Sequence, residues 1–520
     1  MATGLSIGTR VENERRELPL ETDLNGSKKE CYMVKQKSLK KNFIMNAILT
    51  MSSFIFPLIT FPYVSRVLGP TGTGKVAFGT SLISYFSMLA QLGIPTYGIR
   101  ACAKVRDDRE VLTRTAHELL IINLIMNVVS YALFFLAIAF IPSLQDDKTL
   151  YVILSSIILL TSIGMEWLYK ALEQYTYITI RSLIFKLVAL VAMFLLVHKQ
   201  EDYVIYGGIT ILASSASYIF NLMNAHRYIG FKPVGGYDLK RHLKAVAIFF
   251  AMACATTIYT HLDEVMLGFM ATKLDVGYYH ASVRIKVILV SIVTSIGTVL
   301  LPRVSYYIEK KQMEAFRSIT KKALNFVILF STPLMLYFIF FAREGIFLLS
   351  GDAYEGSIIP MQIIMPTLLL VGITNILGIQ ILVPMGREKV VLYSEIAGAV
   401  TDIILNALLI PRFTAAGAAF GTLSAEIVVL IVQYRALKDE ITDAFKAIRF
   451  GTILFALVLG SIGSIWCKWV RLGVFPTLLI SALCFFPIYA LTLLIRKEEL
   501  AVQLFSQGKS TLRTFLGRTH

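Results

Sequence analysis

Long apolar runs dominate the chain, and they limit its fold more than any other feature of the sequence. An α-helix needs about 20 apolar residues to cross the hydrocarbon core of a bilayer. Fourteen such runs are present, at residues 43–65, 76–98, 118–141, 150–170, 177–197, 203–224, 245–268, 277–302, 322–341, 358–384, 389–410, 415–436, 449–469 and 474–495. We therefore expect an all-α polytopic membrane protein with about fourteen membrane-spanning helices.

The composition and the short connections exclude a soluble enzyme. Hydrophobic residues make up 56% of the 520 residues and charged residues only 16%, whereas a soluble domain carries about 25% charged residues. A membrane glycosyl-transferring enzyme is disfavoured, because such an enzyme needs a sizeable loop for its active site. The five cysteines are scattered and form no metal-binding motif or disulfide framework. We predict a protein that is not an enzyme.

The basic residues set the predicted orientation. The chain has 50 Lys and Arg against 34 Asp and Glu, which gives a net charge of +16. Lys and Arg accumulate in cytoplasmic loops, and most of them fall in the cytoplasmic connections if both termini are placed in the cytoplasm. Topology therefore explains the positive charge, and we expect no nucleic-acid partner.

The order of the runs predicts two lobes of six helices each. We expect a polar cytoplasmic tail at 1–42, an N-terminal lobe at 43–224, a cytoplasmic linker at 225–244, a C-terminal lobe at 245–436, two further helices within 449–495 and a cytoplasmic tail at 496–520.

A repeated motif supports this division. Leu68-Gly69 and Gly74 in the first lobe correspond to Leu267-Gly268 and Gly277 in the second. Equal topology in the two halves predicts lobes related by an axis along the membrane normal. The alternative is that Leu-Gly pairs recur by chance in apolar sequence.

Several short motifs occur in a recognisable order along the apolar runs. They are Pro62–Pro70 (PYVSRVLGP), Gly93-Ile94, Tyr97–Arg100 (YGIR), Asp263–Gly268 (DEVMLG), Gly277–Tyr279, Gly297–Ser305 and Gly417–Ala419. In this order they resemble the polysaccharide (O-antigen type) flippases, in the superfamily that also holds multidrug extruders and lipid II flippases. The resemblance implies a two-lobed transporter of the bacterial cytoplasmic membrane. Such a transporter moves an undecaprenyl-pyrophosphate-linked oligosaccharide to the outer leaflet by alternating access.

The resemblance also implies partners and leaves alternatives. The partners are the lipid-linked oligosaccharide, the membrane lipids and, as candidates, polysaccharide polymerase and glycosyltransferases. Many members of the family have twelve spans, so the last two predicted spans are a departure shared with the lipid II flippases, which stay an alternative. A multidrug or cation antiporter of the same superfamily is a second alternative, and a non-transporting membrane scaffold is a third.

Basic residues inside the predicted spans are the first candidates for a transport site. A charged side chain at the bilayer centre costs about 2.5–3.5 kcal/mol on insertion scales. Arg181 and Lys186 lie on the fifth run, and Arg284 and Lys286 lie on the eighth. A cavity between the lobes that is lined by Lys186, Arg284 and Arg181 suits a pyrophosphate, which guanidinium groups bind through paired hydrogen bonds.

These basic residues also have alternative interpretations. The side chains could instead extend to the headgroups or pair with acidic residues such as Asp263. Lys286 lies two positions from Arg284, which is about 200° around a helix. We therefore do not expect the two side chains to face the same cavity. Arg66 and Arg100 flank helix ends, where interfacial anchoring is common, and the family motifs make them further candidates.

Acidic and amide residues form a second candidate site. Glu395 and Asp402 on the eleventh run are seven residues apart and share a helix face, and Asn406 follows one turn later. Glu426 on the twelfth run and Asp263 on the seventh are candidates to join this stripe. Polar residues inside a bundle can carry a coupling ion, Na⁺ or H⁺, and we expect no other cofactor. A neutral carboxyl group bonded to Ser or Thr gives the same pattern.

Overall fold

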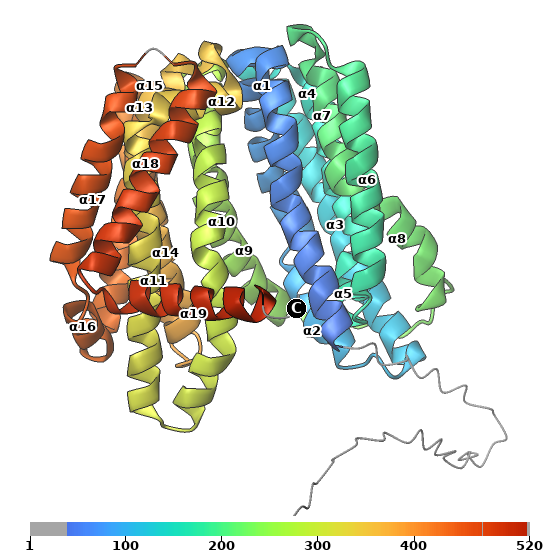
Figure 1. The fold of residues 1–520 in the computed structure, drawn as a ribbon. Helices are drawn as coiled ribbons and strands as arrows, with labels where there is room; N and C mark the ends of the chain where they lie inside the picture. The colour runs from blue at the N-terminus through green and yellow to red at the C-terminus, as the bar shows by residue number, and fades with distance from the viewer. Residues whose placement is uncertain (1–38, 471, 517–520) are drawn as a thin grey trace, which may run out of the picture.

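The computed structural model describes residues 39–470 and 472–516, and every regular element in these ranges is helical (Figure 1). The first group of elements comprises α1 (Leu39–Gln91), α2 (Ile94–Ala103), α3 (Arg109–Phe140), η1 (Pro142–Leu144), α4 (Lys148–Ile163), α5 (Glu166–Ala171), α6 (Tyr175–Leu196), η2 (Gln200–Asp202), α7 (Tyr203–Ile211), η3 (Leu212–Ala216), α8 (Tyr218–Asn224) and η4 (Ala225–Arg227). The predicted tail at 1–42 lies almost wholly outside the described residues.

The remaining elements form the second half of the chain. They are α9 (Lys240–Met270), α10 (Lys273–Glu309), α11 (Met313–Phe340), α12 (Ala342–Ser350), η5 (Asp352–Ser357), α13 (Ile358–Ile364), α14 (Thr367–Asn375), η6 (Ile376–Leu382), α15 (Glu388–Ala436), α16 (Lys438–Lys446), α17 (Phe450–Ile465), η7 (Trp466–Lys468), α18 (Val474–Ile495) and α19 (Glu499–Leu516). Helix α19 falls within the predicted tail at 496–520, whose last four residues lie outside the described ranges.

The prediction of an all-α multi-pass membrane protein is confirmed. Among the described residues, 11 helices are long and apolar enough to cross a membrane, or up to 12 if the pair 352–364 and 367–382, bent by 46°, is one span. The count reaches fourteen only if α1 and α15 are each divided at an internal turn. The number fourteen therefore stays a prediction.

Helix α1 folds back on itself at Gly69. This residue has φ 65° and ψ 178°, a backbone conformation that glycine adopts without steric cost. Asn42 and Arg106 both reach Glu173, at 3.4 Å and 2.9 Å. The chain therefore returns, after α1 and α2, to the end of the molecule from which it started.

Helix α15 also reverses, at Thr414, which has φ 45° and ψ −123°. Its two limbs lie against each other. Near one end of the hairpin, the Gln433 amide donates a hydrogen bond to the Ser394 hydroxyl over 3.1 Å. Further along, a Cβ atom on Gly421 would lie 2.2 Å from Asn406 Oδ1, so only glycine allows this close approach.

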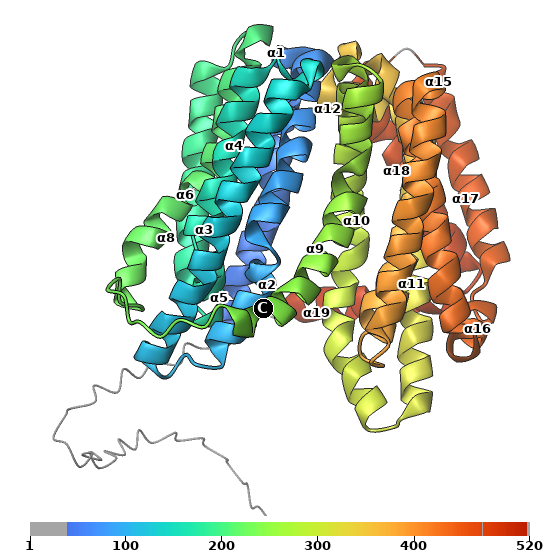
Figure 2. The ribbon, with the colours of Figure 1, turned by 180° about the vertical axis from the view of Figure 1, so that it is seen from behind.

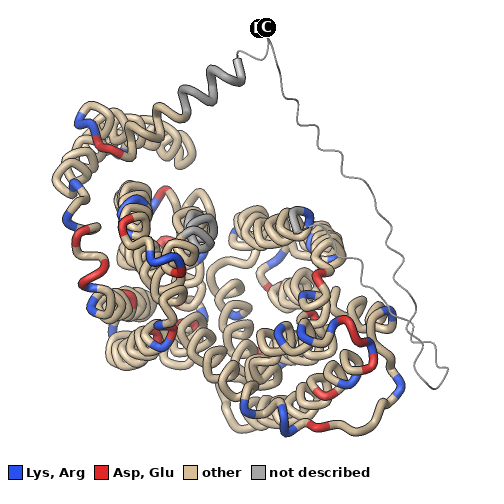
Figure 3. The backbone as a smooth tube through the Cα atoms, turned by 90° about the horizontal axis from the view of Figure 1, so that it is seen from below, with Lys and Arg blue, Asp and Glu red and all other residues tan. Residues whose placement is uncertain are grey.

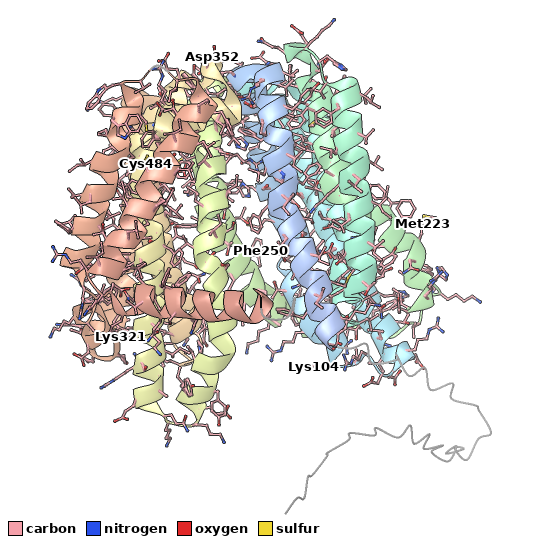
Figure 4. All side chains as sticks on the ribbon, in the orientation of Figure 1. Lys104, Met223, Phe250, Lys321, Asp352 and Cys484 are labelled. Atoms are coloured by element: carbon pink, nitrogen blue, oxygen red, sulfur yellow. The ribbon has the colours of Figure 1, made fainter. Side chains whose placement is uncertain are left out.

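The helices form two lobes that meet at the upper end of Figure 1. Helices α1 to α8 lie on one side and α10 to α18 on the other, and the lower part of α9 lies between them (Figures 1 and 2). Seen from below, the two groups of helices lie apart (Figure 3). Asp352 marks the upper end, Lys104 the lower end of the first lobe and Phe250 the position of α9 between the lobes (Figure 4).

The repeated glycine motif forms the contact between the lobes at the upper end. A Cβ atom on Gly74 would lie 1.8 Å from the carbonyl oxygen of Lys273, and one on Gly277 would lie 1.9 Å from that of Pro70. The backbones of α1 and α10 therefore touch where the two glycines cross. Close beside them, the hydroxyl groups of Thr73 and Tyr354 are hydrogen-bonded over 2.7 Å. The corresponding positions of the two halves are thus partners in one interface.

This contact predicts the effect of a single methyl group. Gly277→Ala places a Cβ atom against backbone that has no room for it, so the upper end should separate. We expect an impermeant thiol reagent, added from the upper-end side, to label a cysteine placed at Thr80 several-fold faster than in the parent protein. The native cysteines are replaced in all variants.

Gly451→Ala is the matched control, because a Cβ atom there meets no atom within 4 Å. Equal labelling rates in the two alanine variants would show that the glycine contact does not hold the upper end closed.

Candidate functional site

A cavity of about 430 Å³ lies between the lobes, below the upper contact. Arg181 and Lys186 from α6 line it together with Arg284 from α10. A second cavity of about 280 Å³ shares Arg284 and Tyr206 with the first. The structure therefore brings three of the six predicted cations to one cavity, two from the first lobe and Arg284 from the second.

Arg284 is the cation that both cavities share. Its Nε donates a hydrogen bond to His280 Nε2 over 3.0 Å, one turn earlier on α10. Within the described part of the chain, no hydrogen bond engages its two terminal nitrogens. Those nitrogens are free to bind an anion in the cavity.

Lys186 lies on the opposite wall and contacts hydroxyl groups. Its Nζ donates to Ser52 Oγ over 2.8 Å and to Ser53 Oγ over 3.1 Å, both on α1. No carboxylate of a described residue pairs with it. These residues therefore supply no negative charge to balance the ammonium group.

Arg181 differs from these two because a carboxylate lies close to it, that of Glu166, which also pairs with Lys170 over 2.7 Å. The Arg181 side chain is buried and lies 3.5 Å from Glu166 Oε2, and it donates to the carbonyl oxygen of Ser217 over 3.3 Å. The guanidinium also stacks over the ring of Tyr218, 5.1 Å from its centroid. Arg181 lines the cavity, but its geometry fits a structural ion pair.

Arg66 and Arg100 lie away from both cavities. Arg66 donates to the carbonyl oxygens of Leu348 over 2.6 Å and of Leu349 over 3.3 Å, so it caps the last turn of α12. Positive groups stabilise the C-terminal ends of helices, and this cap ties α1 to the other lobe at the upper end. Arg100 is exposed in the last turn of α2. The geometry gives neither residue access to the cavity.

A hydrogen-bonded network next to Arg284 was not predicted from the sequence. His280 Nδ1 lies 2.6 Å from Glu264 Oε1, and the other carboxylate oxygen of Glu264 accepts from the hydroxyl of Ser81. Ser81 Oγ lies 3.1 Å from His261 Nδ1. Since Arg284 occupies His280 Nε2, the proton of this ring must lie on Nδ1. The network links Arg284 to α1 in the other lobe.

A second polar cluster lies inside the lobe that contains α15. Asp263 on α9 accepts from Asn406 Nδ2 over 2.6 Å, from Thr422 Oγ1 over 2.8 Å and from the hydroxyl of Tyr279. Asp402 lies beside Asp263 and interacts electrostatically with it. The structure thus brings together three of the predicted residues, Asp263, Asp402 and Asn406. It adds Thr422 and Tyr279, which the sequence did not single out.

Several oxygens of this cluster have no hydrogen-bond partner. Among the described residues, Asp402 Oδ1, Asn406 Oδ1 and the hydroxyl of Tyr85 are buried and unpaired. Hard cations take carboxylate and amide carbonyl oxygens as ligands. The described residues hold no group of three or more His, Cys, Asp or Glu placed to bind a metal ion. The unpaired oxygens fit a small hard cation or a shared proton.

The remaining candidates lie around the same cluster. Glu426, also buried, accepts from the hydroxyl of Tyr259. Lys286 is close enough to Asp402 and Glu426 to interact electrostatically with both. Glu395 is half-buried and interacts with Glu426 in the same way. Lys286 therefore faces the acidic cluster.

Residues 39–308, about half of the chain, match the family of polysaccharide biosynthesis proteins, and residues 247–408 match the MatE family. The chain belongs to the polysaccharide biosynthesis protein family. The resemblance found in the sequence motifs is thereby confirmed.

Relatives of this polysaccharide biosynthesis protein support the assignment. The "Putative O-antigen transporter" of Escherichia coli (strain K12) is 25% identical over 407 residues, which are 78% of this chain and 97% of the relative. The protein of the same name from Shigella dysenteriae is 25% identical over 415 residues, 77% of this chain and 100% of the relative. A solved structure of the lipid II flippase MurJ, in an inward closed conformation, matches with a TM-score of 0.68 at 15% identity. The match covers 88% of this chain and 99% of that one, and it shows the fold alone.

The Glu264 network predicts a change in stability. Glu264→Gln replaces the buried carboxylate by a neutral amide, so the hydrogen bonds with His280 and Ser81 lose their charge assistance and only one of the two acceptor oxygens remains. The loss of one buried charge-assisted hydrogen bond costs about 1.5–3 kcal/mol. We expect the Tm of the purified protein to fall by several degrees.

Glu201→Gln, at an exposed position between α6 and α7, serves as the control. A Tm that is unchanged in both variants would show that the network does not stabilise the contact between α1 and α9.

Proposed function

We propose that this protein is a flippase that carries an undecaprenyl-pyrophosphate-linked oligosaccharide from the cytoplasmic to the outer leaflet. The observation that carries the proposal is the cavity between the lobes, where neither Arg284 nor Lys186 forms a direct ion pair with a carboxylate of the described residues. A pyrophosphate is an anion that guanidinium and ammonium groups bind strongly. The names of the sequence relatives, O-antigen transporters, support a polysaccharide precursor as the cargo.

Transport by rocking of the two lobes accounts for the geometry. The lobes touch at Gly74 and Gly277, and the cavity lies below this contact. Opening the upper contact while the lower ends approach each other exposes the same cations to the opposite side, as in other transporters with repeated halves. Hydroxyl groups of Ser53, Thr60 and Thr210 line the cavity and suit a sugar headgroup.

The orientation follows from the basic loops. We place the lower end and both termini in the cytoplasm of a bacterium and the upper end outside, since Lys and Arg accumulate on the cytoplasmic side. Polysaccharide polymerase and glycosyltransferases are the partners expected to act after and before transport. A cation antiporter is disfavoured, because unpaired cations in the cavity repel a cationic drug.

We further propose that the Asp263 cluster, which includes Asp402, Asn406 and Thr422, binds the coupling ion, Na⁺ or H⁺. The unpaired oxygens of Asp402 and Asn406 support this role. Glu426 and Glu395 extend the acidic surroundings of the cluster, and Lys286 balances part of their charge.

Removal of the cavity cation tests the cargo assignment. Arg284→Ala should lower export of the surface polysaccharide at least about tenfold, because a hydrogen bond to a charged group contributes about 1.5–3 kcal/mol. Arg284→Lys should retain part of the activity. The measurement is the amount of surface polysaccharide relative to the amount of flippase in the membrane.

Arg412→Ala, at an exposed position on α15, is the control and should export normally. Normal export by Arg284→Ala at equal protein level would remove Arg284 from the transport site.

Neutralisation of Asp402 tests the ion site. Asp402→Asn keeps the size of the side chain and removes its capacity to carry a proton or a negative charge, so transport into proteoliposomes should lose most of its response to a Na⁺ or H⁺ gradient. Asp352→Asn, exposed at the upper end, should respond like the parent protein. An unchanged response to both gradients in Asp402→Asn would exclude the cluster as the coupling site.

A further inference from the structure

Helices α1 and α6 enclose a second hollow on the outer side of their lobe. It has a volume of about 380 Å³ and an almost entirely apolar lining. Its apolar residues include Ile48, Met51, Ile55, Ile59, Leu187 and Leu190. Met51 and Leu187 are 59% and 62% exposed, so this surface faces the lipid. We call it the α1–α6 groove.

Lys186 lies in the wall between the α1–α6 groove and the cavity between the lobes. Both Lys186 and Phe56 line the two spaces, whereas Ser52 lines only the groove and Ser53 only the cavity. The two serine hydroxyls donate to the carbonyl oxygen of Leu49, at 2.6 Å and 3.2 Å. Their lone pairs therefore accept from Lys186, which is fixed at the boundary.

An ammonium group in this position needs an explanation. A lysine deep in the bilayer costs about 2.5–3.5 kcal/mol, and the described residues supply it with hydroxyl groups but no carboxylate. The hydrocarbon chain of a membrane lipid in the groove offers nothing to this charge. A ligand with a long apolar chain and an anionic group at its end satisfies both the groove and Lys186.

We propose that the α1–α6 groove holds the polyprenyl chain of the cargo and that Lys186 binds the phosphate next to that chain. This inference rests on the proposed function, and it specifies where the polyprenyl chain of the cargo lies. The chain stays against the lipid-facing side of α1 and α6 while the headgroup occupies the cavity. Arg284, on the other lobe, is then available to bind the second phosphate.

The gap between α1 and α10 is the competing route for the chain. A hollow there is lined by Leu58, Val287 and Arg284, and it measures only about 30 Å³. That volume is less than a tenth of the volume of the α1–α6 groove. The groove offers far more room to a hydrocarbon chain, so the structure favours it.

Photocrosslinking tests the location of the chain. A benzophenone amino acid replaces Leu187 or Ile55 in the groove, Val287 in the competing gap, or Leu483 on the lipid-facing side of α18. The full-length variants are reconstituted with radiolabelled undecaprenyl pyrophosphate and illuminated. We expect labelling at Leu187 and Ile55 several-fold above Leu483, with competition by unlabelled undecaprenyl pyrophosphate and none by phosphatidylglycerol.

Three results overturn the inference: labelling at Val287 alone, equal labelling at Leu483, or equal competition by phosphatidylglycerol. The last result would mean that ordinary lipid occupies the groove.

A second arm tests Lys186. In Lys186→Met, uncharged undecaprenol should compete for the groove as well as undecaprenyl pyrophosphate does, and Lys186→Arg should restore the preference for the pyrophosphate. A preference that persists in Lys186→Met would remove Lys186 from the headgroup contact.

Transport of a lipid-linked oligosaccharide by the parent protein distinguishes a failure of the groove assignment from a failure of the proposed function. If the parent protein transports it but the groove is not labelled, the groove assignment fails alone. If the parent protein transports no lipid-linked oligosaccharide, the proposed function fails.

Discussion

The low polarity of the bilayer decides how charged side chains are arranged in this protein. Hydrocarbon offers no partner to a charge, so each one must be matched by the protein or face an aqueous space. Arg181 lies near the carboxylate of Glu166, which also pairs with Lys170, and Asp263 accepts from three hydrogen-bond donors. Lys186 and Arg284 make direct hydrogen bonds only to neutral groups among the described residues, and both line the cavity between the lobes. The unmatched charges are therefore the reason for proposing that this cavity binds the anionic headgroup.

Much of this arrangement follows from the sequence, because it depends on local composition and on the cost of charge. The apolar runs predict the helices, and the deep positions of Lys186 and Arg284 predict their place in the cavity lining. The repeated glycines predict corresponding positions in two halves. Their direct contact, Gly74 against Gly277, depends on how the lobes are placed relative to each other, which a linear pattern does not contain.

The network of Glu264, His280 and Ser81 could not be predicted from the sequence, because its members come from helices that are far apart in the chain. Glu264 and His280 lie near helix ends, where a histidine is usually solvated, and Ser81 lies 183 residues before Glu264 in the chain. No local spacing connects them. Arg66 shows the opposite case, since its motif marked it as important and the structure gives it a helix cap rather than a cavity position. A family motif identifies a residue that matters, and the structure decides whether it contacts the cargo or supports the fold.

The two polar sites are connected through neighbouring residues of one helix. Asp263 belongs to the proposed ion site, and Glu264 is the acceptor of the network that holds Arg284. Consecutive residues on a helix point about 100° apart, so α9 presents one carboxylate to each site. A rotation or shift of α9 that follows ion binding at Asp263 must also move Glu264. The movement changes the hydrogen bond that Arg284 makes through His280. The helix between the lobes thus provides a direct physical link between the proposed ion site and the proposed headgroup site.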